Sequence, residues 1–288
     1  MSVAVAIGAV EARRLARNPA IWVSLAPALV WAEFVGDPLG EHFLLSGYGV
    51  VLSWFVSMVI IALAARRTAA SGATGVFDVL PSDAGPRTLG IGTAGVAAAG
   101  LTLVVMIVVW AWRRPGNVLG VSSGTMPAGV EIPRPILAQL IQGPLVLVVF
   151  VGIGLVVGRW LPNSLVLPAL VVAIALQFVL FGVWEPGATT WYSWLLPMSS
   201  GWVAGERFGD CHSTTGDCVL PLEGFDSVTP WWHVGYLVCM AGLLFSIATA
   251  SQYAHRRRLT IAGCWLFGLL LFSAVQLAVY QRFDGALP

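Results

Sequence analysis

Long apolar stretches, separated by shorter polar segments, run through the whole chain. A hydrocarbon core about 30 Å thick requires roughly 20 apolar residues in each helix that crosses it. Seven stretches meet this requirement, at residues 19–35, 43–64, 89–112, 136–158, 164–184, 231–252 and 259–280. The pattern therefore predicts an all-α fold, a polytopic bundle of about seven transmembrane helices.

The composition strengthens this prediction. Hydrophobic residues make up 58% of the 288 residues and charged residues only 10%, and the mean hydropathy is +0.84. Soluble domains contain about 45–50% apolar and about 25% charged residues. A soluble fold would lack the polar surface needed to cover itself. We therefore expect an integral membrane protein in which residues 1–288 form a single transmembrane domain.

The basic residues exclude several functions, because all fifteen are arginines and the chain contains no lysine. A retinal protein needs a lysine for its Schiff base, and a Walker-A loop needs a lysine on the nucleotide phosphates. We therefore expect neither a retinal cofactor nor a nucleotide site in this chain. The sequence has no paired-Glu or His-x-x-x-His zinc pattern and no Ser–His dyad that can be placed, so no metal and no catalytic residue are expected.

The arginines also predict the orientation of the helices, since cytoplasmic loops carry an excess of basic residues. With a cytoplasmic N-terminus, ten of the fifteen arginines fall inside and ten of the fourteen acidic residues fall outside. The ten are Arg13, Arg14, Arg17, Arg66, Arg67, Arg87, Arg159, Arg256, Arg257 and Arg258. The predicted topology therefore has the N-terminus inside and the C-terminus outside.

The N-terminal segment, residues 1–18, contains too few apolar residues to cross the membrane. It is predicted to lie along the interface or to extend the first helix, and its charged residues are Glu11, Arg13, Arg14 and Arg17. Asn18 can cap a helix that starts at Pro19, because proline is tolerated at the first helical position. A cleaved signal peptide is disfavoured, since no small-x-small cleavage site follows before Glu33.

The outer loop, residues 185–230, contains Cys211 and Cys218 in the run GDCHSTTGDC. Outside the membrane the compartment is oxidising, and a spacing of seven residues closes a short loop. We expect a disulfide between these two cysteines. The alternative is a metal site that adds His212, Asp210 and Asp217 as ligands.

Ionisable residues are scarce inside the predicted spans, which disfavours an ion-driven carrier. Glu33 and His233 are expected at the membrane interface. Four glutamines are expected to hydrogen-bond between helices, namely Gln139, Gln142, Gln177 and Gln276. Gly154 and Gly158 form a GxxxG pair, for which close packing within the chain is favoured over a dimer seam.

The segment between the second and third spans, residues 66–88, is too long for a tight turn. Residues 76–80 form a short amphipathic piece, whose apolar residues are Val76, Phe77, Val79 and Leu80, and Pro81 ends it. Such a cytoplasmic helix can dock a soluble partner or can rest on the membrane surface as a linker.

Two phrases resemble the membrane subunits of type-2 ATP-binding cassette (ABC) exporters, especially the compact permeases of high-GC bacteria. Residues 11–19, EARRLARNP, look like the segment that leads into that family's first span. Residues 73–81, ATGVFDVLP, are similar to its coupling helix. Arg66 and Arg67 replace the usual acidic residue before that helix, and the family's core has six spans, so residues 259–280 would form an extra one.

The resemblance implies a permease that receives work from a separate nucleotide-binding subunit, which would hold ATP and magnesium. The coupling contacts would come from Val76, Phe77, Asp78, Leu80 and Pro81. It also implies short external re-entrant helices within residues 185–230, and a second permease copy or a homologous permease as a partner in the lipid bilayer. No nucleic-acid partner is expected.

The scarcity of charge in the spans favours an amphipathic or lipid-like cargo over an ion. The competing interpretation is a membrane assembly factor or sensor that transports nothing and uses the outer loop for binding. Co-purification of a nucleotide-binding subunit would distinguish the two.

Overall fold

The computed structural model describes residues 3–34, 51–70, 84–113, 137–161, 166–178, 195, 197, 206–208, 222–225, 229–250 and 255–284. These residues form eight helices: α1 (Val3–Arg17), α2 (Pro19–Phe34), α4 (Val51–Ala70), α5 (Ala84–Arg113), α6 (Leu137–Trp160), α7 (Val166–Phe178), α8 (Thr229–Ala248) and α9 (His255–Asp284). Each of the seven predicted apolar stretches overlaps one of the helices α2 to α9. The helical bundle is therefore as the hydropathy pattern predicted.

Four of these helices are long and apolar enough to cross a membrane, judged by length and composition within the described residues. They contain the segments Arg87–Val108, Leu140–Trp160, Trp231–Ala248 and Leu259–Val279. The other three predicted spans correspond to α2, α4 and α7, which have 16, 20 and 13 residues. The total of seven spans stays a prediction.

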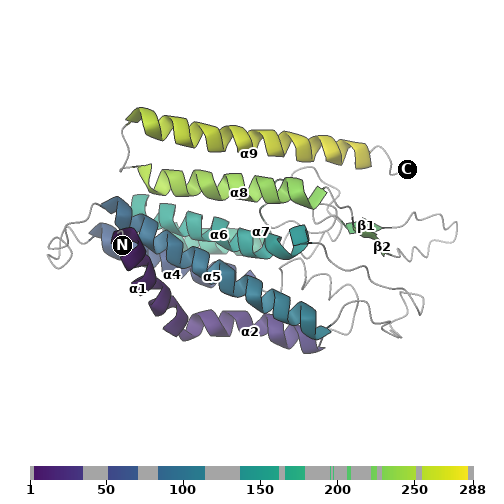
Figure 1. The fold of residues 1–288 in the computed structure, drawn as a ribbon, viewed down its shortest axis with the longest axis horizontal. Coiled ribbons are helices and arrows are strands. Elements are labelled where there is room, and N and C mark those ends of the chain that lie inside the picture. Colours follow the sequence, from purple (N-terminus) through teal and green to yellow (C-terminus); the bar gives the residue numbers. More distant parts are fainter. Residues whose placement is uncertain are drawn as a thin grey trace.

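Successive helices from α2 to α9 alternate in direction, so that their ends gather at two opposite ends of the bundle (Figure 1). At one end lie α1, the last turn of α4, the first turn of α5, the last turn of α6 and the first turn of α9. Ten of the arginines in the described ranges lie on these elements, and Arg113, Arg207 and Arg282 lie at the other end. We call the first end the arginine-bearing end. The fold groups the arginines as the orientation argument predicted.

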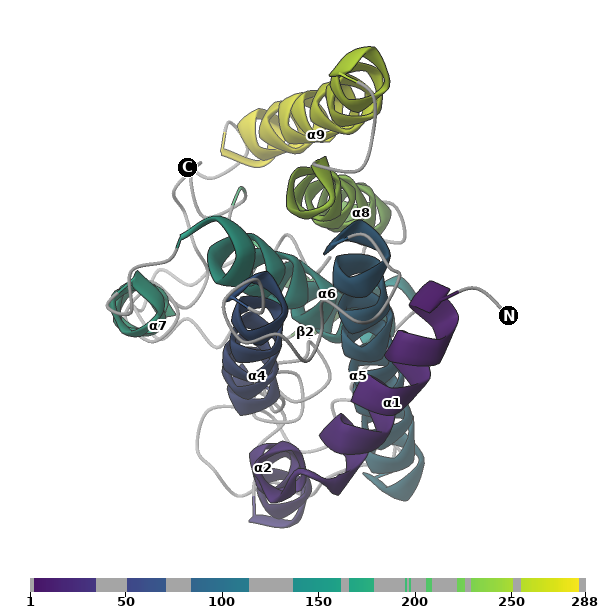
Figure 2. The same cartoon turned by 90° about the vertical axis from the view of Figure 1, so that its left-hand side faces the viewer.

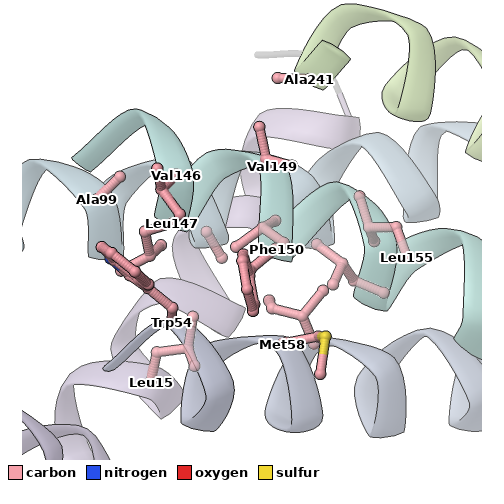
Figure 3. Packing of buried hydrophobic residues seen from close by; sticks show 14 of the residues in the cluster. Leu15, Trp54, Met58, Ala99, Val146, Leu147, Val149, Phe150, Leu155 and Ala241 are labelled. Carbon is pink, nitrogen blue, oxygen red and sulfur yellow. The ribbon is translucent and has the colours of Figure 1, made fainter. Parts of the chain in front are cut away.

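Helix α6 occupies the centre of the bundle, with α4, α5, α7 and α8 around it (Figure 2). Its strongest packing is against α4, where Trp54, Met58 and Phe150 are almost completely buried (Figure 3). The Phe150 ring lies 5.9 Å from the Trp54 ring and meets the Phe55 ring edge-on at 5.4 Å between centroids. Such aromatic pairs add stabilisation beyond the area they bury.

The GxxxG pair of α6 explains why α4 and α6 approach so closely. A Cβ atom on Gly154 would lie 2.5 Å from the carbonyl oxygen of Met58, and one on Gly158 would collide with the carbonyl oxygen of Ala62. Only glycine leaves room for these backbone contacts, which small residues allow between membrane helices. The pair packs within the chain, as predicted.

Helix α1 packs along α5 and therefore does more than lie on an interface. Gly8 is buried against Gly90 and Thr93, and Leu15 is buried in the main hydrophobic core. Asn18 separates α1 from α2, and its side-chain oxygen accepts a hydrogen bond of 3.0 Å from the Ala20 amide. The predicted cap is confirmed, and the N-terminal segment is part of the folded bundle.

Two short strands lie beyond the helical bundle. Strands β1 (Glu206–Phe208) and β2 (Leu222–Phe225) form an antiparallel pair at the end opposite the arginine-bearing end (Figure 1). The sequence analysis did not predict them. Within residues 185–205 only Leu195 and Pro197 are described, so the predicted re-entrant helices lie outside the described residues.

Candidate functional site

The predicted coupling segment is shorter at both ends than the sequence analysis placed it. Helix α4 continues to Ala70 and α5 begins at Ala84, so Arg66, Arg67 and Arg87 are helical residues and do not belong to a linker. The apolar run ends at residue 64, but the helix continues through the two arginines, because arginine is a good helix former. The end of the membrane span at residue 64 stays a prediction. The five predicted coupling residues, Val76, Phe77, Asp78, Leu80 and Pro81, lie outside the described residues.

The two helices that flank this segment are both hydrogen-bonded to the end of α6. The Arg159 guanidinium donates to the Thr88 hydroxyl in the first turns of α5. On the other flank, the Arg66 guanidinium near the end of α4 donates to the Leu161 carbonyl at 3.2 Å. Residues 159 and 161 therefore tie together the ends of α4 and α5.

The residue between them makes a third connection. The Trp160 indole N–H donates to the Ile247 carbonyl near the end of α8 at 3.1 Å. The Arg159 guanidinium also lies 5.6 Å from the centre of the Trp160 ring, within the range of a cation–π contact. We call Arg159, Trp160 and Leu161 the α6 junction. Each of its three residues contacts a different neighbouring helix.

Unsatisfied helix ends explain why these bonds form. The last four carbonyls of a helix have no partner in their own helix, and a positive charge near them is favourable. Leu161 follows the last residue of α6, and Ile247 is the penultimate residue of α8. The guanidinium of Arg66 and the indole of Trp160 each satisfy one such carbonyl.

The arginine-bearing end is strongly electropositive. Glu11 is the only carboxylate that the described residues place there, and it pairs with Arg14 on the next turn of α1 at 2.6 Å. Arg13 and Arg17 are exposed on the same helix. Arg87 is only 8% exposed and Arg159 is half-buried, so the inner guanidiniums are part of the packing. This end can attract anionic headgroups or acidic side chains of a partner.

A second polar cluster lies at the opposite end of the bundle, between α8 and α9. His233 is 1% exposed, and its Nδ1 lies 3.1 Å from Oε1 of the equally buried Gln276. The His233 ring stacks on Tyr236 at 5.7 Å, and the Tyr236 hydroxyl donates to the Leu195 carbonyl at 2.5 Å. Helix α9 covers the His233 side chain, and its expected position at the membrane interface stays a prediction. The hydrogen bond expected between helices at Gln276 is confirmed.

Two of the four cysteines, Cys239 and Cys264, lie within the described residues. Cys211 and Cys218 lie outside the described residues, although strands β1 and β2 pair on either side of them. Their disulfide, and the alternative metal site, stay predictions. Cys239 is a buried free thiol and Cys264 an exposed one. Within the described ranges, no group of three His, Cys, Asp or Glu side chains could hold a metal ion.

Comparison with known proteins adds no relative to this description. No family model, no curated protein and no solved structure matches the chain. The family resemblance therefore rests on the sequence: the phrases at residues 11–19 and 73–81, the aromatic stretch at 189–205 and the order of the apolar segments.

Proposed function

We propose that this chain is the permease subunit of an ABC exporter, a multi-pass protein of the cell membrane. It moves an amphipathic or lipid-like substrate with energy from ATP that a separate nucleotide-binding subunit hydrolyses. The chain itself is not an enzyme. A second permease copy, or a homologous permease, completes the substrate path.

The observation that supports this proposal most is the position of the segment between α4 and α5. Its flanks leave the bundle at the arginine-bearing end, where positive charge favours the cytoplasmic side. Both flanks are hydrogen-bonded to the α6 junction. A segment whose flanking helix ends are held by hydrogen bonds can transmit a displacement from a soluble partner to the bundle. A linker that only rests on the membrane surface cannot.

Phe77 and Leu80 are the proposed anchors on the nucleotide-binding subunit. Buried aromatic and aliphatic anchors commonly cost about 2 kcal/mol or more of binding free energy when they are truncated, and rim charges cost much less. The double variant Phe77→Ala/Leu80→Ala should therefore lose the subunit from a pull-down and lose ATP hydrolysis by the complex. Asp78→Ala should have a milder effect.

A matched control is Leu259→Ala in α9, because Leu259 is an apolar residue at the same end and is 61% exposed. It should retain both the subunit and the hydrolysis. Wild-type pull-down and hydrolysis in the double variant would remove the coupling assignment.

The orientation has its own test. In a variant whose native cysteines are serines, a cysteine placed at Asp78 should react only with reagent added from the cytoplasm. A cysteine at Asp226 should react only from outside. Reaction of both from one side would refute the alternating topology.

A membrane sensor or assembly factor is the second candidate. The paired strands β1 and β2 favour it, since they give the outer segment a structure on which a binding site could form. Failure of any nucleotide-binding subunit to co-purify with the intact chain would favour this candidate over the exporter.

A further inference from the structure

The α6 junction makes three specific connections to helices far away in the sequence. Arg159 contacts a residue 71 positions earlier, Trp160 one 87 positions later, and Leu161 one 95 positions earlier. We propose that Arg159, Trp160 and Leu161 are the positioning residues that carry movement of the coupling segment into α6 and α8. This inference rests on the proposed function.

The first step concerns the roots of the coupling segment. The segment is attached to the bundle through the end of α4 and the start of α5. Thr88 on α5 and Arg66 on α4 are both bonded to the α6 junction. A displacement of the segment therefore moves the end of α4 and the start of α5 relative to the same three residues. Either the end of α6 moves with them or the hydrogen bonds break.

The second step concerns what α6 does with that displacement. Gly154 and Gly158 hold α6 against the backbone of α4, and Gly92 and Gly95 of α5 pack against Leu155 and Val151 of α6. Such close-packed helices move as rigid bodies, since packed interfaces do not deform continuously. Movement at the α6 junction is thus passed along α6.

The third step reaches α8. Trp160 is bonded to Ile247 at the end of α8, and Tyr236 in the first half of α8 is bonded to Leu195, which precedes that helix in the chain. A tilt imposed on α8 at the arginine-bearing end therefore also displaces the part of α8 that lies toward the opposite end. The bonds define a continuous route from the coupling segment to the outer segment.

The simpler interpretation is that Arg159 and Trp160 only anchor α6 at the membrane surface, as arginine and tryptophan often do. Anchoring needs charge and an indole at the right depth but no particular partner. The two interpretations therefore differ in what they predict for Thr88, an uncharged residue whose hydroxyl accepts the Arg159 bond.

The test uses the complex of the full chain with its co-purified nucleotide-binding subunit in lipid nanodiscs. Thr88→Val removes the hydroxyl at nearly constant volume, whereas Thr88→Ser keeps it. Thr102→Val is the matched control, because the Thr102 hydroxyl bonds only to Ala98 of its own helix. We expect Thr88→Val to lower ATP hydrolysis by the complex about 2- to 30-fold, the range typical for residues along a coupling route.

The amount of captured subunit should stay at the wild-type level in all three variants, because the docking residues are unchanged. Thr88→Ser and Thr102→Val should hydrolyse ATP at wild-type rates. Trp160→Phe keeps an aromatic ring beside Arg159 but removes the indole N–H, so it should lower hydrolysis while leaving the captured subunit unchanged.

Two outcomes separate the inference from the proposed function. If Phe77→Ala/Leu80→Ala loses the subunit but Thr88→Val and Trp160→Phe hydrolyse at wild-type rates, the α6 junction has no positioning role and the function stands. If no subunit is captured by the wild-type chain, the function and the inference both fail. A Thr88→Val protein that does not fold, while Trp160→Phe folds with full hydrolysis, also overturns the inference.

Discussion

Helices α6 and α9 are both apolar and both long enough to cross a membrane, yet 72% of the α6 span and only 6% of the α9 span are buried within the protein. Helix α6 touches four neighbours, while the principal neighbour of α9 is α8 alone. Lipid tails are as apolar as leucine, so an apolar surface is equally stable against lipid or against protein. Hydropathy therefore selects the helices that span, and close packing decides which become central.

The residues at the two contacts differ in the way this argument requires. Helix α6 presents glycines to the backbone of α4, whereas α9 meets α8 through large side chains, since the rings of Phe272 and Trp265 lie against Gly235 and Gly242 of α8. Backbone contact increases the number of atoms in van der Waals range, and each such contact adds a small attraction. The predictions below test this difference between α6 and α9.

The largest effect is expected for loss of an aromatic ring from the core. Phe150→Ala removes both ring contacts with α4, whereas Phe267→Ala in α9 removes a ring that is 69% exposed. Truncation of a buried phenylalanine costs about 3–5 kcal/mol of unfolding free energy. We expect a loss of that order at Phe150 and almost none at Phe267, measured by reversible unfolding in mixed micelles. Equal losses would show that α9 is buried against a partner.

A smaller but still large effect is expected for filling the glycine contact. Gly158→Leu forces α6 away from Ala62 of α4, whereas a Cβ atom on Gly263 of α9 would meet nothing within 4 Å. Overpacking typically costs about 1–3 kcal/mol of stability. Gly158→Leu should lower the thermal midpoint clearly and Gly263→Leu should leave it unchanged. A destabilised Gly263→Leu protein would contradict the peripheral position of α9.

The polar contact between α8 and α9 should contribute less. Gln276→Leu removes the bond to His233, and hydrogen bonds between membrane helices contribute about 0.6 kcal/mol on average and at most about 1.7. The control is Ser273→Ala, because the Ser273 hydroxyl bonds to Leu269 of its own helix. We expect a loss of unfolding free energy within that range for Gln276→Leu and a smaller one for the control. A loss well above this range would mean that the pair also organises other contacts.

The smallest effect is expected at the exposed ion pair of α1. The Arg14 side chain is 62% exposed, and exposed pairs on a helix contribute about 0.3–0.5 kcal/mol. Arg14→Ala should therefore lower the unfolding free energy by at most about 0.5 kcal/mol more than Arg13→Ala, an exposed neighbour on the same helix. Thermal unfolding at low and high salt measures both. A clear loss at Arg14 alone that disappears at high salt would assign the pair a larger role.

Several features of the fold could be predicted because they depend on local properties of the chain. The start of α2 at Pro19 follows from a capping asparagine, and the positions of the apolar helices follow from run length. The helix boundaries near Arg66 and Arg87 could not be predicted as well, since hydropathy falls at an arginine whether or not the helix continues. The close packing at Gly154 and Gly158 of α6 could also be predicted, because two residues four positions apart lie on one face of a helix.

The sequence by itself determined the helical class, the apolar segments and the grouping of arginines at alternate helix ends, because each depends on residues that are neighbours in the chain. Only the tertiary structure decided that α6 is central and α9 peripheral, that His233 is buried, and that α1 docks on α5. It alone joined Arg159, Trp160 and Leu161 to three other helices. Those partners lie 71 to 95 residues away, and no local pattern specifies which apolar helix packs beside which.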